Sequence, residues 1–218
     1  KKRGAKVVVI DSYRSRTAKA ADWHIMPKPG TDGALAMAII NYITTNNLVD
    51  KDYVEKYTNG FEELKIHSKE KTSTWASEIT GISKEEIEKF SFELATIQPA
   101  AIRIGVALER HHGGGQTIRA VTCIPALTGA WKFVGGGITQ FPVWEHPYKF
   151  DVICRPDLVP ENTRVINALQ IGRALNNEIH DEIPIKSFMC WNANPVTQAP
   201  ETEKIVSGLL RDDIFVVS

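Results

Sequence analysis

The stretch Val7–Asp32, VVVIDSYRSRTAKAADWHIMPKPGTD, decides the fold of this chain. It opens with four β-branched residues, Val7–Ile10, and the acid Asp11 follows them directly. A continuous apolar run of this kind is typical of a buried parallel strand. A second apolar piece, Trp23–Met26, leads into a turn that ends at Asp32, and a long helical pattern begins there. This order predicts the start of an open α/β sheet.

Both acids stand where an open α/β sheet binds its ligands, outside the carboxyl ends of its strands. Asp11, at a strand end, is well placed to accept hydrogen bonds from both hydroxyls of a ribose. The turn before the helix offers free N–H groups and the positive end of the helix dipole. Thr31 or Asp32 is also a good N-cap for that helix. Asp32 therefore has two compatible interpretations, a helix cap and a ligand contact.

The same residues resemble the nucleotide-binding domain of the molybdopterin oxidoreductases, the dimethyl sulfoxide reductase superfamily. Those enzymes carry a strand that ends in Asp-Pro-Arg, then T-x-x-A-x-x-A-D, then R-P-G-T-D-x-A-L. The matching residues in this chain are Asp11, Arg14, Thr17, Ala20–Asp22, Pro29–Asp32, Ala34 and Leu35. The chain departs from the pattern in two places, because Ser12 and Tyr13 stand before Arg14 and Lys28 replaces the arginine before Pro29.

The composition excludes several classes of protein. The 218 residues suit one large domain or one and a half smaller ones, and 43% hydrophobic residues suffice for a core. The formal net charge is zero, which gives no reason to expect a nucleic acid as a partner. No segment reaches the roughly 18 apolar residues that a membrane span needs, so we expect no membrane contact from this chain.

Cysteine spacing and the chain ends carry further expectations. Cys123, Cys154 and Cys190 form no C-x-x-C pattern, so the sequence predicts neither an iron–sulfur cluster nor a zinc site here. Their odd number argues against a disulfide framework. The chain runs from Lys1 straight into a strand and stops at Ser218 on another, so we expect a fragment of a longer protein. The compartment of that protein is left open.

The expected fold is α/β, a three-layer open sheet that is mostly parallel and Rossmann-like, with helices on both faces and a helical insertion. Residues 1–137 are assigned to a guanosine-binding α/β domain, with the insertion at 50–98. Residues 138–164, rich in proline and aromatic residues, are expected to form an irregular linker. Residues 165–218 are expected to be a βαβ portion of a second related domain or a continuation of the same sheet.

Periodicity and capping residues predict the individual elements. Apolar residues spaced three and four apart predict helices, and Ser83-Lys84-Glu85-Glu86 has the form of a capping box. Helices are expected at 33–47, 50–57, 60–64, 74–79, 84–97, 117–127, 165–176 and 201–210. Strands are expected at 99–106, 185–191 and 214–217.

A second candidate loop follows the strand expected at 99–106. Gly113–Gly115 allow the backbone to approach a ligand closely, and their position before a helix suits a phosphate. Gly105, at the end of the strand, belongs to the same loop. A plain connection is the alternative, because neither G-x-G-x-x-G nor a Walker lysine is present. The adjacent His111 and His112 make a poor metal pair, and we expect one of them to line the loop.

The resemblance continues along the chain. In the family an Arg-bearing helix leads to L-T-G and then G-G-G, and a later strand ends in G-x-N-P. The matching residues here are Arg119, Leu127–Gly129, Gly135–Gly137, Asn194 and Pro195. Asn192 stands in place of the glycine of that last motif. Turn formation is the alternative role for Asn192 and Asn194, since asparagine bonds locally in turns.

The resemblance implies a bis(molybdopterin guanine dinucleotide) cofactor with molybdenum or tungsten in the parent protein. It implies that Asp11 binds ribose hydroxyls and that Asp32 accepts hydrogen bonds from guanine N1–H and its 2-amino group. Arg14 and Lys28 would lie near the diphosphate or base. The full set of expected cofactor contacts is Asp11, Arg14, Lys28, Gly30, Asp32, Gly105, His112, Gly113, Asn192 and Asn194.

The catalytic centre is expected outside this chain. In the family, the cysteines that bind the iron–sulfur cluster and the residue that ligates the metal precede this stretch. The chain alone is therefore expected to be inactive, with the rest of the parent chain and an electron-transfer subunit as its partners. Two alternatives are a stand-alone α/β nucleotide-binding module and a scaffold domain without a ligand, since such sheets host many functions.

Overall fold

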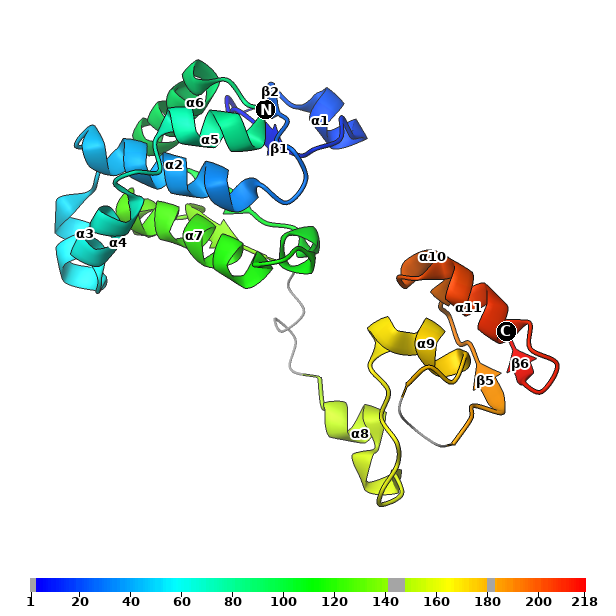
Figure 1. Ribbon diagram of the computed structural model, residues 1–218. Helices are drawn as coiled ribbons and strands as arrows, with labels where there is room; N and C mark the ends of the chain where they lie inside the picture. Colours follow the sequence, from blue (N-terminus) through cyan, green and yellow to red (C-terminus); the bar gives the residue numbers. More distant parts are fainter. Residues whose placement is uncertain (1–2, 141–147, 180–182) are drawn as a thin grey trace. The chain divides into compact units, whose positions relative to one another are not determined.

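The computed structural model describes residues 3–140, 148–179 and 183–218. The chain divides into two compact units, unit 1 (Lys1–Pro147) and unit 2 (Tyr148–Ser218), which Figure 1 shows and which are described separately. The division between the units falls within the linker predicted at 138–164. Among the described residues, no helix combines the length and the apolar character that crossing a bilayer requires.

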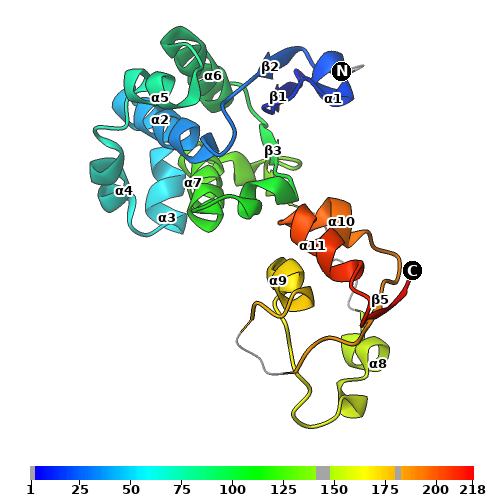
Figure 2. The same ribbon diagram turned by 45° about the vertical axis from the view of Figure 1, so that its right-hand side comes forward.

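Unit 1 contains two pairs of short parallel strands. β1 (Val8–Ile10) pairs with β2 (Trp23–Ile25), and α1 (Arg16–Ala20) connects them, as Figure 2 shows. β3 (Ala101–Arg103) pairs with β4 (Gly137–Thr139). The α/β class with short parallel strands is confirmed. The described strands form separate pairs, so the three-layer Rossmann-like sheet stays a prediction.

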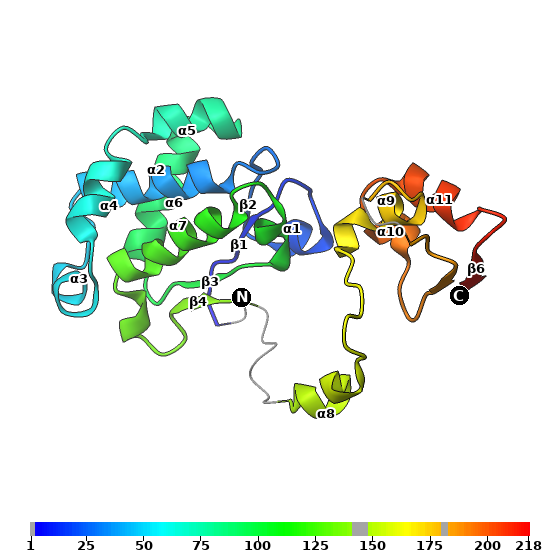
Figure 3. The same ribbon diagram turned by 60° about the horizontal axis from the view of Figure 1, so that its bottom comes forward.

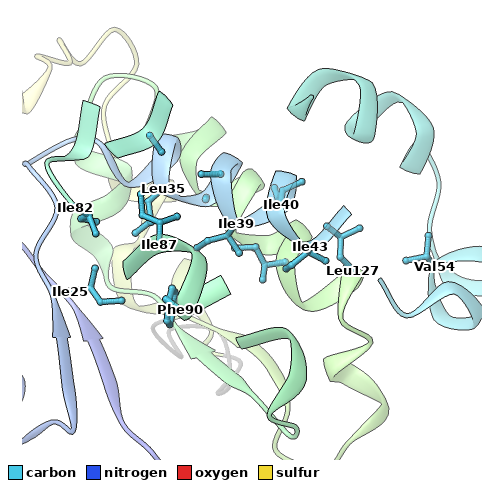
Figure 4. Close-up of a cluster of buried hydrophobic side chains, with 14 residues drawn as sticks. Ile25, Leu35, Ile39, Ile40, Ile43, Val54, Ile82, Ile87, Phe90 and Leu127 are labelled. Carbon is cyan, nitrogen blue, oxygen red and sulfur yellow. The ribbon is translucent and has the colours of Figure 1, made fainter. Parts of the chain in front are cut away.

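Helix α2 (Asp32–Thr45) is the centre of unit 1. Four other helices pack against it, and Figure 3 shows it between α5 and α7. These helices are α4 (Phe61–Ser68), α5 (Ser73–Thr80), α6 (Lys84–Thr96) and α7 (Gly114–Leu127). Because α2 is covered on several sides, its apolar residues are buried all round the helix rather than along one stripe. Figure 4 shows the resulting cluster, which includes Leu35, Ile39, Ile40, Ile43, Ile87, Phe90 and Leu127.

Trp23 links the β1–β2 pair to α6 through a hydrogen bond and a ring contact. Its Nε1 donates to Glu86 Oε1 at 2.8 Å, and its ring meets Phe90 edge to face with 5.8 Å between the ring centroids. The Lys6 ammonium lies 4.8 Å from the centroid of the Trp23 ring, within cation–π distance. Ser83 Oγ caps α6 by accepting from the Glu86 N–H, as predicted. The Glu86 carboxylate, which would turn back to the cap in a full capping box, binds Trp23 instead.

Asp50 joins the start of α3 (Lys51–Tyr57) to the end of α7. Its carboxylate accepts from the Tyr53 N–H at 3.0 Å and forms an ion pair with Lys132. Its own N–H donates to the Leu127 carbonyl at 2.8 Å. The hydrogen bond from Lys132 is the largest cause that lowers the pKa of the Asp50 carboxyl below its ordinary value, and the Tyr53 N–H adds to it.

Asp50→Ala is expected to lower the free energy of unfolding by about 1–2 kcal/mol, because a helix cap and an ion pair are lost. Since the folded-state pKa is depressed, the ionic contribution is present above the unfolded-state pKa and disappears as the pH falls through the folded-state pKa. Urea unfolding between about pH 7 and pH 3 measures the difference between the two proteins. Asp52→Ala, an exposed acid in the same helix, is the control. A loss that stays constant with pH would contradict the role of the ion pair.

Steric crowding explains why glycines follow α7. A Cβ at Gly136 would lie 2.1 Å from the Ala130 carbonyl oxygen, in η2 (Ala130–Lys132). A Cβ at Gly137 would lie 2.4 Å from Trp131 Nε1. Gly129 has a φ of +62°, in the left-handed region that favours glycine. The L-T-G and G-G-G sequences therefore mark a tight backbone corner that leads from α7 into β4.

Unit 2 is built on two helices that touch closely, α9 (Ile171–Leu175) and α11 (Thr202–Leu209). Glycine allows this approach, because a Cβ at Gly208 would lie 2.4 Å from Leu175 Cβ. The strands β5 (Ser187–Met189) and β6 (Phe215–Val217) form a parallel pair. The other elements are α8 (Phe150–Cys154), η3 (Pro156–Leu158), η4 (Ala168–Gln170) and α10 (Pro195–Gln198).

Two segments, 138–164 and 165–176, differ from the prediction. The linker predicted as irregular at 138–164 contains α8 and η3 among its described residues, and β4 occupies its first positions. The helix predicted at 165–176 is shorter, because Asn167 Oδ1 accepts from the Leu169 N–H and the chain turns through η4 before α9 begins. Val165 is 90% exposed and packs against nothing that would hold it in a helix.

Candidate functional site

Two loops of unit 1 meet where α2 and α7 begin. One loop leads from β2 to α2 and the other from β3 to α7. A Cβ on Gly30 would lie 3.5 Å from His111 Nδ1, and a Cβ on Gly33 would lie 2.9 Å from Thr117 Oγ1. The two helices therefore start side by side, as Figure 1 and Figure 3 both show. We call the segments 27–33 and 105–117 the loop junction.

Asp11 lies at the same end of the β1–β2 pair as the first of these loops. The two strands are parallel, so both chains leave them in the same direction. The Asp11 N–H donates to the Ile25 carbonyl at 3.1 Å, and its own carbonyl accepts from His24 Nε2 at 2.9 Å. Asp11 Oδ1 accepts from the Tyr13 N–H at 3.1 Å. Arg14 is exposed in the turn that follows. The half-buried Asp11 carboxylate is thus held in place while its second oxygen is left for another donor.

The turn before α2 is fixed through its backbone. The Lys28 N–H donates to the Thr80 carbonyl at 2.9 Å, and Thr31 Oγ1 donates to the Lys28 carbonyl at 2.6 Å. The Lys28 side chain lies over Gly81, where a Cβ would be 3.2 Å from Lys28 Cε. Thr31 is the N-cap of α2, but it makes no side-chain cap hydrogen bond. Asp32 is half-buried in the first turn of that helix.

The second loop carries glycines that face open space. No heavy atom lies within 4 Å of the position that a Cβ would take at Gly105, Gly113 or Gly115. Gly113 has a φ of +74° and precedes α7 without a side-chain cap. Gly114 is the exception, since it is buried and its N–H donates to the His111 carbonyl at 2.9 Å. The strand predicted at 99–106 ends at Arg103, and a 3-10 helix, η1 (Val106–Arg110), follows Gly105.

Local sequence did not distinguish His111 from His112, and the structure separates them. Both side chains are exposed, but the contact with the first loop is made by the His111 ring. His112 was chosen from the sequence as a cofactor contact, and that assignment stays a prediction. No pattern near either histidine signals a partner so far away along the chain, so only the packing of α2 against α7 reveals the contact.

The candidate residues of unit 2 form a separate loop after β5. Asn192 has a φ of +48°, and Asn194 is the N-cap of α10. Cys190 Sγ donates to the Ala193 carbonyl at 2.9 Å across the turn between them. Both asparagines are exposed, as is Trp191 with 85% of its surface accessible. Asparagine in the left-handed region is typical of a turn, so the turn role and a ligand role are compatible here.

The described residues offer little for a metal ion or a nucleophile. Within ranges 3–140, 148–179 and 183–218, no group of three or more His, Cys, Asp and Glu side chains is arranged to hold a metal. The pKa of the half-buried Cys123 thiol is raised, mainly by burial. This side chain is therefore a poor nucleophile. The chemistry available at the loop junction is therefore hydrogen bonding and charge recognition by Asp32, Lys28 and backbone N–H groups, and Asp11 adds a carboxylate at the end of β1.

Short parallel strands set among many helices define a helix-rich α/β protein. The family model for molybdopterin oxidoreductases matches residues 1–218, and the chain belongs to that family. It is 39% identical over 218 residues to "Probable oxidoreductase YoaE" of Bacillus subtilis (strain 168), which covers all of this chain and 32% of that protein. It is 30% identical over 242 residues to "Probable dimethyl sulfoxide reductase chain YnfF" of Escherichia coli (strain K12), covering 96% of this chain and 30% of that one.

A solved structure shares the fold of part of the chain. Acetylene hydratase from Pelobacter acetylenicus matches with a TM-score of 0.59 and 38% sequence identity. The match covers 62% of this chain and 18% of the hydratase. The chain spans about a third of the length of the curated relatives it matches.

Proposed function

We propose that this chain is part of a molybdenum or tungsten oxidoreductase and binds the guanosine diphosphate end of molybdopterin guanine dinucleotide at the loop junction. Membership of the molybdopterin oxidoreductase family supports the cofactor class. The observation that carries the site is the close approach of the two loops, since a Cβ on Gly30 would lie 3.5 Å from His111 Nδ1. This approach brings two helix starts together, and Asp32 lies in the first turn of one of them.

The loop junction suits a diphosphate. The first N–H groups of a helix have no partner within it, and they point toward the positive end of the helix dipole. The Ala34 and Gly114 N–H groups donate to backbone carbonyls, and neither α2 nor α7 has a side-chain cap that would occupy the other donors. Gly113 and Gly115 leave open space beside the start of α7, so an anion can approach the backbone closely. Lys28 and Arg14, both exposed, would add positive charge.

The two acids suit the nucleoside. In this proposal Asp32 accepts hydrogen bonds from guanine N1–H and the 2-amino group, a pair of donors that adenine does not present. Asp11 binds the ribose hydroxyls through the oxygen that Tyr13 leaves free. Since each acid follows one of two neighbouring parallel strands, a single nucleoside could reach both.

The wider proposal concerns the parent protein. The bound cofactor supplies two-electron redox chemistry at molybdenum or tungsten, and this chain supplies binding and orientation. In its bis form the cofactor's second arm would lie near Asn192 and Asn194, and the two strand pairs of unit 1 would belong to one three-layer Rossmann-like sheet. We propose that the iron–sulfur cluster and the metal ligand lie in the preceding part of the parent chain. This chain alone is then inactive, and its partners are the rest of the parent chain and an electron-transfer subunit.

Calorimetric titration of the 218-residue chain with GDP, GMP, ADP and NAD tests the site. GDP is expected to bind more tightly than ADP, and Asp32→Ala is expected to weaken GDP by about 10- to 100-fold, because hydrogen bonds to a charged group are lost. ADP affinity should be unchanged, so the preference disappears. Asp52→Ala is the matched control, an exposed acid in the first turn of another helix. Tighter binding of adenine nucleotides than of guanine nucleotides would favour a different nucleotide-binding module. No binding of any of the four nucleotides would favour a scaffold domain.

A further inference from the structure

We propose that His111 is a diphosphate-binding residue, whose ring packs on Gly30 and donates an N–H to a phosphate oxygen of the ligand. The inference rests on the proposed function, since it names a further contact in the same site. It assigns this contact to His111.

The position of the His111 ring is the first step. Gly30 has a φ of +77°, in the left-handed region, so glycine is favoured there. A Cβ at Gly30 would lie 3.5 Å from His111 Nδ1 and 3.8 Å from its Cγ. The imidazole therefore lies on the face of the turn from which a side chain would project. Because Gly30 has no side chain, the ring is free to lie on this face of the turn.

The backbone of His111 is anchored to the other loop. Its carbonyl accepts from the Gly114 N–H at 2.9 Å, at the first turn of α7. A single residue thus lies beside the turn that precedes α2 and bonds to the first residue of α7. Because helix starts attract anions, a group held between two of them lies where the phosphates are proposed to bind.

The His111 imidazole has the chemistry to bind a phosphate. An imidazole carries at least one N–H donor, and such donors form charge-assisted hydrogen bonds with phosphate oxygens. Among the described residues, the His111 ring has no hydrogen-bond partner and it is exposed. Its donor is therefore free for a ligand, while its packing on Gly30 limits the directions in which it can point.

The test measures the affinities of guanosine, GMP and GDP for the 218-residue chain and three variants. His111→Phe keeps a ring over Gly30 but removes the N–H donor. It is expected to weaken GDP by about 10-fold and to leave guanosine unchanged. His111→Gln keeps an N–H donor and should retain most of the GDP affinity. His67→Phe, the matched control at an exposed histidine of α4 outside the loop junction, should bind all three ligands like the unchanged protein.

The outcomes separate the inference from the function on which it rests. Normal GDP binding by His111→Phe would show that the ring only packs, and an equal loss for guanosine and GDP would show a purely structural role. Either result overturns the assignment of His111 and leaves guanine recognition intact. A chain that binds none of the three ligands, with a circular dichroism spectrum showing that it is folded, would overturn both proposals.

Discussion

Replacing Ile40 by alanine is expected to lower the free energy of unfolding by about 2–5 kcal/mol, the range for large-to-small changes in a core. Ile40 lies in α2 and is fully buried, with 0% of its surface exposed. It belongs to the cluster drawn in Figure 4. The surrounding helices pack on α2 from several sides and cannot all move inward, so a cavity remains. Domains have total stabilities of about 5–15 kcal/mol, so urea unfolding resolves such a loss easily.

Ile66→Ala provides the matched control. It is the same substitution in a helix of the same unit, α4, but Ile66 is 72% exposed. Its free energy of unfolding is expected to change by no more than about 0.5 kcal/mol. If the two variants lost stability equally, burial at α2 would not be what holds unit 1 together.

The parts of the fold that were predictable are those that local chemistry determines. The apolar run Val7–Ile10 predicts a strand, and β1 occupies Val8–Ile10. The helix expected at 33–47 is α2, since its apolar spacing and the preceding turn both indicate a helix start. Ser83 caps α6, because a serine hydroxyl satisfies a free N–H wherever the chain enters a helix. In each case the residues that decide the structure are neighbours in sequence.

The predictions that were wrong concern segments whose length depends on residues distant in the sequence, against which they pack or pair. Residues 165–176 have helical spacing, but a helix forms only at Ile171–Leu175, where Gly172 and Leu175 pack on α11. Upstream, the Asn167 side chain competes for a backbone N–H. The strand expected at 99–106 stops at Arg103, and among the described residues β3 pairs with β4 over Ala101–Arg103. Pattern alone cannot show how long a partner is.

The candidate site likewise has one part that could be predicted from the sequence and one part that could not. That Asp11 and the turn before α2 follow adjacent parallel strands could be expected from their order in the sequence. The meeting of Gly30 with His111 could not, because it depends on the packing of α2 against α7. Their roles toward a cofactor stay predictions, and the titrations described above decide them.

Gly114→Ala is expected to destabilise unit 1 by about 3 kcal/mol, at the upper end of the range for overpacking. A Cβ there would lie 2.5 Å from the Leu108 carbonyl oxygen, 2.7 Å from Glu109 Cα and 2.8 Å from the Glu109 carbonyl carbon. All three are backbone atoms, so no side-chain rotation relieves the contact. Either η1 or the start of α7 has to move, and the bond from the Gly114 N–H to the His111 carbonyl is then strained or lost.

Gly115→Ala separates this steric effect from a general effect of alanine near a helix start. Gly115 is the next residue of α7, and a Cβ there would have no heavy atom within 4 Å. Because alanine favours helix over glycine by up to about 1 kcal/mol, Gly115→Ala should leave the free energy of unfolding unchanged or raise it. Both variants are compared by urea unfolding without nucleotide. Since a shifted η1 also carries His111 away from Gly30, Gly114→Ala should lose GDP affinity as well, and equal stability of the two variants would contradict the close packing of η1 on α7.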